Sequence, residues 1–159
     1  HHKMDQPEYF PLQKEGIPYV LSDDALARVN VIAGEIMGVS GPVVTKSPVN
    51  AATLEMQRGA RLDIALPVEH NAFLYALDGK LNIDGYGITD GLNALVFAND
   101  GDGVSLEAVE DTRVLLVSGA PLNEKVVAHG PFVMNTETQI LEAIRDYQKG
   151  KMGVLIEDD

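Results

Sequence analysis

Short runs of alternating apolar and polar residues recur along most of this chain, with turn-forming residues between them. From residue 28 onwards such a run begins roughly every eight to twelve residues, which is typical of an all-β fold with many short strands. We therefore predict strands over 18–21, 29–33, 42–45, 51–57, 61–66, 71–77, 80–84, 86–88, 93–98, 104–109 and 112–118. Their regular spacing favours an antiparallel barrel or jelly roll made of two packed sheets.

The clearest turn signal lies in residues 69–85, EHNAFLYALDGKLNIDG. Two apolar strands, 71–77 and 80–84, flank the dipeptide Asp78–Gly79. An Asp-Gly connection suits a type I′ turn, in which both central residues need a positive φ. The pattern therefore predicts a β-hairpin here. We expect the last two predicted strands to pair in the same way across Glu110–Asp111.

The hydrophobic period changes near the end of the sequence. Apolar residues then recur at helical spacing, at Ile140, Ala143, Ile144 and Tyr147. Thr136 and Gln139 match a capping box, and Gly150 suits the position just after a helix. We therefore predict a helix over about 137–149, with an apolar stripe that covers the edge or one open end of the barrel.

The first residues differ from the rest because they carry several prolines and no regular period. We interpret residues 1–27 as an extended arm or inter-domain linker, residues 28–153 as one domain that includes the helix, and residues 154–159 as an acidic tail. The arm is apolar enough that we expect it to lie on the barrel or on a neighbour. His1–His2 is open to two interpretations, a remnant of an affinity tag or a native linker.

Composition and charge narrow the classes of function. The chain has 159 residues and a formal net charge of −12. This acidic balance argues against direct binding to nucleic acid or to an anionic membrane, because phosphate contacts need a basic surface. No apolar run approaches the ~18 residues of a membrane span, and no signal-peptide pattern is present. The lack of cysteine excludes disulfides and thiolate chemistry and fits a reducing compartment, so we predict a cytoplasmic location.

The last third of the sequence resembles a known family. Residues 129–153 read HGPFVMNTETQILEAIRDYQKGKMG, and the GPFVMNT run, the acidic helix and the Asp-Tyr-x-x-Gly pattern are together specific to the closing segment of the pirin family. Upstream, VIAGEIMGVSGPVVT, LPVEHNAFLYALDGKL and VLLVSGAPL are similar to that family's second cupin domain. The resemblance covers nearly the whole chain but only the second half of a two-barrel protein. It implies a cupin fold, the RmlC-like jelly-roll double-stranded β-barrel, with an N-terminal arm and one C-terminal helix.

The chemistry that this resemblance implies belongs to the first barrel, which the sequence lacks. In the pirin family the metal, usually iron, is held by three histidines and one glutamate of that barrel, and none of these residues is in this chain. Family members are described as quercetin-dioxygenase-like enzymes and, in animals, as nuclear cofactors of transcription factors. Iron is therefore expected in the absent N-terminal barrel, and no cofactor is expected here.

A second metal site in this chain can be tested by counting ligands. A cupin site uses two histidines and a glutamate from one strand and a histidine from a later strand, because alternate strand residues point to the same face. That frame falls on His70, Ala72 and Ala76 or Leu77, and no histidine lies between His70 and His129. One imidazole does not make a zinc or iron site. We predict no metal ligand, no cofactor-binding residue and no catalytic residue in this chain.

His70 is then the one residue that we assign to a pocket. Its imidazole suits a pocket acid or base, because histidine titrates near neutral pH. The plainer alternative, which we favour, is a histidine at the barrel mouth that is hydrogen-bonded to the backbone.

Three other groups of residues are interpreted structurally. We expect packing rather than a ligand site on the strand face of Phe73, Tyr75 and Leu77. A solvated turn is favoured over a calcium loop for Asp100, Asp102 and Glu107, because their spacing is wrong for calcium. No histidine and acid stand at triad spacing for the two serines Ser40 and Ser118.

Two hypotheses of function follow, with a third as an alternative to both. The first is the metal-free second half of a pirin-like protein, a structural and interaction module that shapes the pocket of the missing first barrel. The second is one part of a metal-dependent quercetin 2,3-dioxygenase-like oxidoreductase. The third is a free-standing cupin that binds a small molecule. The partner expected is the missing N-terminal cupin domain or another protein, with a homodimer as an alternative, and neither nucleic acid nor membrane is expected.

Overall fold

A computed structural model of the chain describes residue 5, residue 9 and residues 11–153. The chain forms two compact units, of which the first ends at Pro121 and the second begins at Leu122. Residues 1–4, 6–8 and 10 of the predicted arm, and the predicted tail 154–159, lie outside the described residues. The domain boundaries taken from the sequence stay a prediction.

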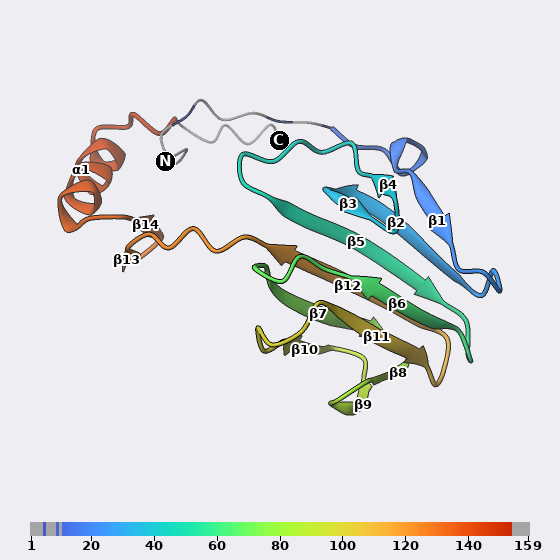
Figure 1. Cartoon of the computed structure of the whole chain (residues 1–159). Coiled ribbons are helices and arrows are strands. Elements are labelled where there is room, and N and C mark those ends of the chain that lie inside the picture. The colour runs from blue at the N-terminus through green and yellow to red at the C-terminus, as the bar shows by residue number, and fades with distance from the viewer. Residues whose placement is uncertain (1–4, 6–8, 10, 154–159) are drawn as a thin grey trace. The chain divides into compact units, whose positions relative to one another are not determined.

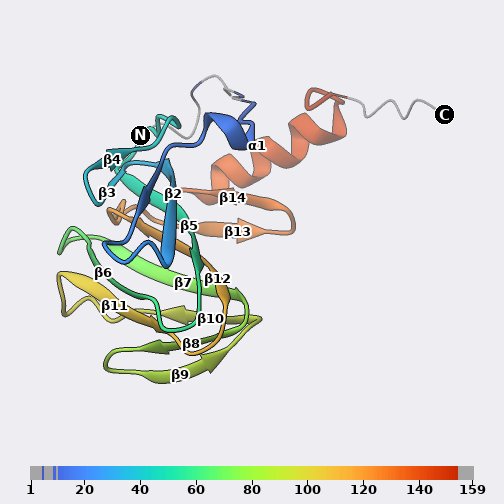
Figure 2. The same ribbon diagram turned by 90° about the vertical axis from the view of Figure 1, so that its right-hand side faces the viewer.

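The first unit is built on two antiparallel sheets (Figures 1 and 2). The six-stranded sheet contains, in spatial order, β1 (Tyr19–Leu21), β2 (Ala27–Ala33), β5 (Val49–Met56), β12 (Thr112–Gly119), β7 (Asn71–Asp78) and β10 (Asn93–Val96). The four-stranded sheet contains β6 (Arg61–Ala65), β11 (Gly103–Ala108), β8 (Lys80–Ile83) and β9 (Gly87–Asp90). A short 3-10 helix, η1 (Lys14–Gly16), precedes β1.

Alternate residues of both sheets form one hydrophobic core. Every second side chain of β6 and β12 is buried, as the alternation of apolar and polar residues predicts. The six-stranded sheet contributes Leu54, Leu74 and Leu116 to the same cluster as Leu62, Leu81 and Leu106 of the four-stranded sheet. Two antiparallel sheets that share a core form a sandwich, so the all-β jelly-roll prediction is confirmed.

The hairpin predicted at Asp78–Gly79 is wrong. Strand β7 pairs with β10 and β12, whereas β8 pairs with β9 and β11, so the dipeptide takes the chain from one sheet to the other. Of the two residues only Gly79 has a positive φ, +72°, whereas a type I′ turn needs two. The pairing predicted across Glu110–Asp111 is wrong for the same reason, because β11 and β12 also lie in different sheets.

These two corners lie against each other at one end of the barrel. The Asp78 carboxylate accepts hydrogen bonds from the Arg113 backbone N–H (2.8 Å) and from Arg113 Nε (2.7 Å). The hydrogen bond from the Arg113 side chain holds the pKa of Asp78 below its ordinary value. A Cβ on Gly79 would come within 2.1 Å of the Asp111 carbonyl oxygen, so only glycine fits there. The Asp78–Gly79 dipeptide, which resembles a hairpin turn in the sequence, therefore forms a tight corner between the two sheets.

A two-residue hairpin does occur, but at Met37–Gly38. These residues have φ values of 51° and 76° and join β3 (Glu35–Ile36) to β4 (Val39–Ser40). The strand predicted over 42–45 is absent from this stretch, where Val43 makes only an isolated bridge to Ala33. The short strand predicted over 18–21 is confirmed as β1, which pairs with β2.

The second unit consists of a hairpin and a helix. Strands β13 (Val127–His129) and β14 (Phe132–Met134), which the sequence did not predict, pair and contact α1 (Glu137–Gln148). The helix begins with the predicted capping box, in which Thr136 and Gln139 exchange hydrogen bonds, and Gly150 follows it with a φ of +70°. No helix in the described ranges is long and apolar enough to cross a membrane.

Fewer residues of α1 are buried than the predicted apolar stripe contains. Ile140 and Ala143 are buried, whereas Tyr147 is 65% exposed and meets the Phe132 ring in an edge contact, with 6.2 Å between ring centroids. Which surface the helix covers beyond its own hairpin stays a prediction.

Candidate functional site

His70 enters the barrel because of the turn before β7. Its backbone N–H donates to the Pro67 carbonyl oxygen over 2.9 Å, which closes this turn. The next residues alternate, so that Ala72, Leu74 and Ala76 face the interior together with His70. The imidazole is buried, with 7% of the residue exposed.

Ser118 is the partner of the imidazole. Its Oγ lies 3.1 Å from His70 Nδ1, and the residue is only 1% exposed. The two come from different strands, since Ser118 stands opposite Ala72 in the register of β12 with β7. The expectation of a backbone partner for the ring is thus corrected, because the ring is bonded to a hydroxyl.

A cavity of about 210 Å³ opens beside this pair. Apolar side chains of both sheets and their loops form part of the wall, namely Leu66, Ile83, Phe97 and Val104. Polar groups of the strand ends and of the loop after β10 supply the rest, namely His70, Asp84, Asn99, Asp100 and Ser105. This mixture is typical of a small-molecule pocket rather than of a sealed core.

The residues of this cavity do not fit a cupin metal. Ala72 and Ala76 occupy the two further positions of the ligand frame, and alanine has no donor atom. Within residues 11–153 and the two described residues before them, no three histidine, aspartate or glutamate side chains gather in a way that could hold an ion. We derive no metal chemistry from this barrel.

The acidic loop is not a calcium site among these residues either. Asp100 lines the cavity, whereas Glu107 lies on β11 and accepts a hydrogen bond from Arg61 Nη2 over 3.0 Å. Asp100 and Glu107 therefore lie in different surroundings, whereas a calcium loop would gather their carboxylates around one ion.

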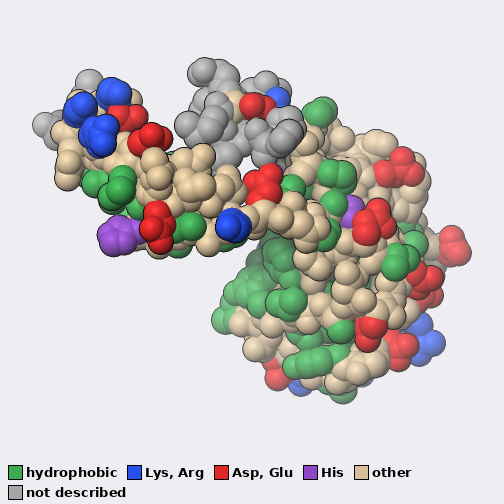
Figure 3. All heavy atoms as spheres, turned by 60° about the vertical axis from the view of Figure 1, so that its left-hand side comes forward, with side chains coloured by type: hydrophobic (Ala, Val, Ile, Leu, Met, Phe, Trp, Pro, Cys, Tyr) green, Lys and Arg blue, Asp and Glu red, His purple; other side chains and the backbone are tan. Residues whose placement is uncertain are grey.

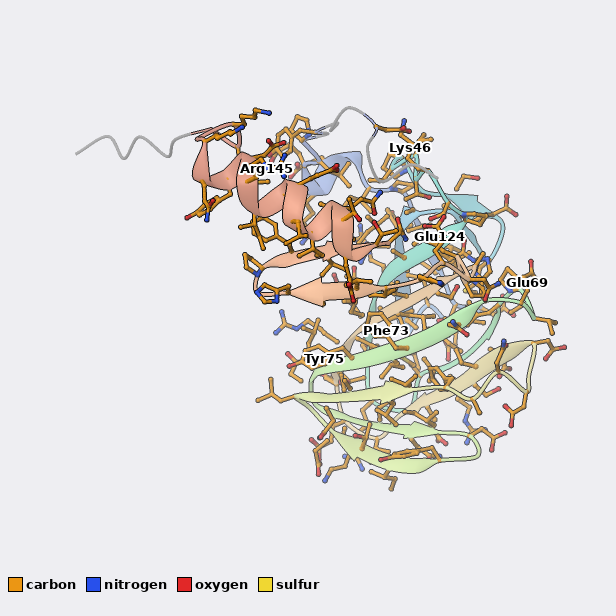
Figure 4. The ribbon with its side chains drawn as sticks, turned by 90° about the vertical axis from the view of Figure 1, so that its left-hand side faces the viewer. Lys46, Glu69, Phe73, Tyr75, Glu124 and Arg145 are labelled. Carbon is orange, nitrogen blue, oxygen red and sulfur yellow. The ribbon has the colours of Figure 1, made fainter. Side chains whose placement is uncertain are left out.

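Phe73, Tyr75 and Leu77 lie on the opposite, outer face of β7. Phe73 is 39% exposed, and its neighbours across the sheet are Val96 of β10 and Val117 of β12. Figure 4 labels Phe73 and Tyr75 on this strand, and Figure 3 shows hydrophobic side chains gathered on one side of the first unit. The expected packing is thus only partial, because this face stays in contact with solvent.

Sequence reasoning missed Ser118 as the partner of His70. The signal was present, since Ser118 follows Val114 and Leu116 at alternate positions and so had to face the interior. The spacing of a catalytic triad along the sequence does not reveal this pair, because it says nothing about the register between distant strands. The loop residues of the cavity gave no such signal, because loops have no fixed period.

Comparison with known proteins agrees with this barrel. Residues 51–153 match the family model of the pirin C-terminal cupin domain. The chain is 36% identical to pirin-like protein 2 of Arabidopsis thaliana, over 95% of the chain and 49% of the relative. It is 35% identical to pirin of Rattus norvegicus, over 95% of the chain and 53% of the relative.

A crystal structure of quercetin 2,3-dioxygenase from Acinetobacter baumannii superposes with a TM-score of 0.87 and 32% identity, over 94% of this chain and 52% of that one. The chain spans about half the length of the curated relatives that it matches. A match over most of the chain, to one domain of a longer protein, accounts for the two sheets, the helix and the length together. The chain therefore belongs to the pirin family and corresponds to its C-terminal cupin domain.

Proposed function

We propose that this chain is the metal-free second half of a pirin-like protein and works as a structural and interaction module. In this role it packs against a first barrel and shapes the pocket of that barrel. The observation that supports this proposal is the apolar character of the outer face of the six-stranded sheet. An antiparallel sheet that faces water alternates between apolar and polar residues, but this sheet is apolar on both faces at its centre.

Two rows across the outer face contain no charged residue. The first row runs Val96, Phe73, Val117 and Ala51, and the second runs Ala94, Tyr75, Leu115 and Thr53. Val96 is 83% exposed on the edge strand β10. Val96, Phe73 and Ala94 are exposed, and the other five residues are half-buried. A contiguous, mostly apolar surface of this kind marks interaction sites in soluble proteins. We name these eight residues the outer apolar face.

The occupant that we propose for the outer apolar face is the first barrel of the longer protein. The relatives are about twice as long as this chain, and the matched part is their C-terminal domain. A preceding barrel is therefore the nearest partner by chain connectivity. A second copy of this chain is the alternative occupant, and we place the assembled protein in the cytoplasm without direct contact to nucleic acid.

The test mixes this chain with the separately purified N-terminal half of the Arabidopsis relative and measures association by calorimetry. The double variant Phe73→Ser, Val96→Ser is expected to bind at least about tenfold more weakly than wild type, because it removes two apolar contacts from the outer apolar face. The matched control is Tyr86→Ser, Ile88→Ser, two similarly exposed apolar residues near the four-stranded sheet. Equal affinity of both variants would contradict the proposal, and self-association that only the first variant abolishes would favour the homodimer.

A second candidate function is supported by the quercetin 2,3-dioxygenase structure. In this proposal the full-length protein is a metal-dependent oxidoreductase with iron in its first barrel, and this chain only lines the cavity. The chain alone is then not an enzyme. Oxygen uptake with quercetin should appear only when an iron-loaded first barrel is present, and turnover by this chain alone would contradict it.

A further inference from the structure

The His70 ring has one nitrogen without a hydrogen bond to any residue that the structure describes. Ser118 takes Nδ1, and no hydrogen bond to Nε2 is made within the described residues. Every polar side-chain atom that is sealed from solvent in this part of the chain has a partner. Because Nε2 has none, it must be reachable by solvent. His70 lines the cavity and is otherwise buried, so Nε2 opens into the cavity.

The Ser118 hydroxyl determines what Nε2 offers. A buried hydroxyl hydrogen needs an acceptor, because leaving it unpaired costs about 1–3 kcal/mol. Nδ1 is the acceptor that Ser118 Oγ meets. We therefore assign the hydroxyl as the donor and Nδ1 as the acceptor, which leaves the hydrogen of the neutral ring on Nε2. The inner wall of the cavity then presents an N–H donor.

The carboxylates that line the cavity give its charge one sign. Asp84 and Asp100 line it and are exposed, and its lining contains no lysine or arginine. The whole chain also carries a formal net charge of −12. An anion would therefore be repelled at the mouth, whereas a neutral or cationic molecule would not.

From these three observations we propose that the cavity binds a small neutral or cationic molecule whose carbonyl-type oxygen accepts a hydrogen bond from His70 Nε2–H. Its volume of about 210 Å³ is below the usual ~300–1,000 Å³ of sites for drug-sized ligands, so the ligand is a compact one. The apolar part of the ligand packs against the apolar wall, and its cationic or hydrogen-bond-donor group lies near the carboxylates of Asp84 and Asp100. This site is separate from the outer apolar face and does not require the first barrel.

The test uses three probes of one shape that differ in charge. These are benzamide, 4-(aminomethyl)benzamide as the cation and 4-carbamoylbenzoate as the anion, titrated into the full chain and followed by two-dimensional NMR. The cation is expected to bind best, with a dissociation constant on the order of 1 mM, and the anion at least about tenfold more weakly. Shifts should centre on Ala72, Phe97 and Val104, which line the cavity.

Variants then identify the donor. His70→Ala should weaken benzamide binding about tenfold, because one hydrogen bond is lost, and His70→Gln should restore part of it through its amide N–H. His129→Ala is the control, since that histidine is exposed on β13. In wild type, long-range nitrogen–proton spectra should show the His70 hydrogen on Nε2, and the added amide should shift that nitrogen.

Several results would overturn the proposal, and none depends on the variants folding. Equal affinity for the anion and the cation would show that the carboxylates at the mouth of the cavity do not select the ligand by charge. A ring hydrogen on Nδ1 would show that Nε2 cannot donate a hydrogen bond. Chemical shift changes that do not saturate, or that lie away from the cavity, would show that the probes do not bind there. Loss of association with a first barrel, with these results intact, would affect only the function proposed above.

Discussion

His70 and Ser118 show how single residues decide what one end of a cupin barrel can do. A metal-binding cupin needs a second imidazole at the position of Ala72, and the methyl group of alanine supplies no ligand. Ser118, directly opposite Ala72 on β12, instead forms a hydrogen bond with the imidazole of His70. The pair satisfies two buried polar groups at once, so it stabilises the barrel whether or not the cavity is filled.

At this scale we predict that Ser118→Ala destabilises the chain by about 1–2 kcal/mol, because Nδ1 of the buried imidazole loses its partner. Urea unfolding followed by circular dichroism measures the change. Ser105→Ala is the matched control, since Ser105 is exposed on the rim of the same cavity, and its effect should stay within about 0.5 kcal/mol. Equal effects of the two substitutions would mean that the hydrogen bond contributes nothing.

The elements are arranged by two tight corners that cross between the sheets. One joins β7 to β8 through Gly79, and the other joins β11 to β12. The Asp78 carboxylate holds Arg113 at the start of β12, so each corner fixes the other. Four strands of two different sheets are thereby held in position at one end of the barrel.

Gly79→Ala should test this arrangement against the same substitution at Gly85, a glycine with nearly the same φ. The φ values are +72° for Gly79 and +77° for Gly85, but a Cβ at Gly85 would meet nothing within 4 Å. Both alanine variants bear a left-handed strain of about 1–2 kcal/mol. We expect Gly79→Ala to lose at least about 2 kcal/mol more in thermal or urea unfolding. A similar loss from both would show that the corner has room to relax.

Sequence patterns predicted elements better than their pairing. The alternation of apolar and polar residues located most strands, and the capping box located the start of α1. Both patterns depend on residues that are near each other in the chain. The Asp78–Gly79 turn was assigned to the wrong partner because a positive φ at Gly79 suits a sheet-to-sheet corner as well as a hairpin. The same locality explains why His70 was found but Ser118, 48 residues away, was not.

At the scale of the whole molecule, the chain corresponds to one domain of longer relatives. The first unit has one hydrophobic core between its two sheets, and its outer apolar face is the surface that we propose for a partner. The chain spans about half of its curated relatives. Both features are what the proposed role of a structural and interaction module predicts.

We predict that this barrel holds no catalytic metal of its own. The most direct measurement is the iron content after anaerobic reconstitution with Fe²⁺ and gel filtration, with His1–His2 removed to exclude binding by those two residues. We predict well below about 0.1 iron per chain, because one imidazole is too few ligands for a specific site. About one tightly held iron per chain, lost in His70→Ala, would contradict the claim and place a metal centre in this barrel.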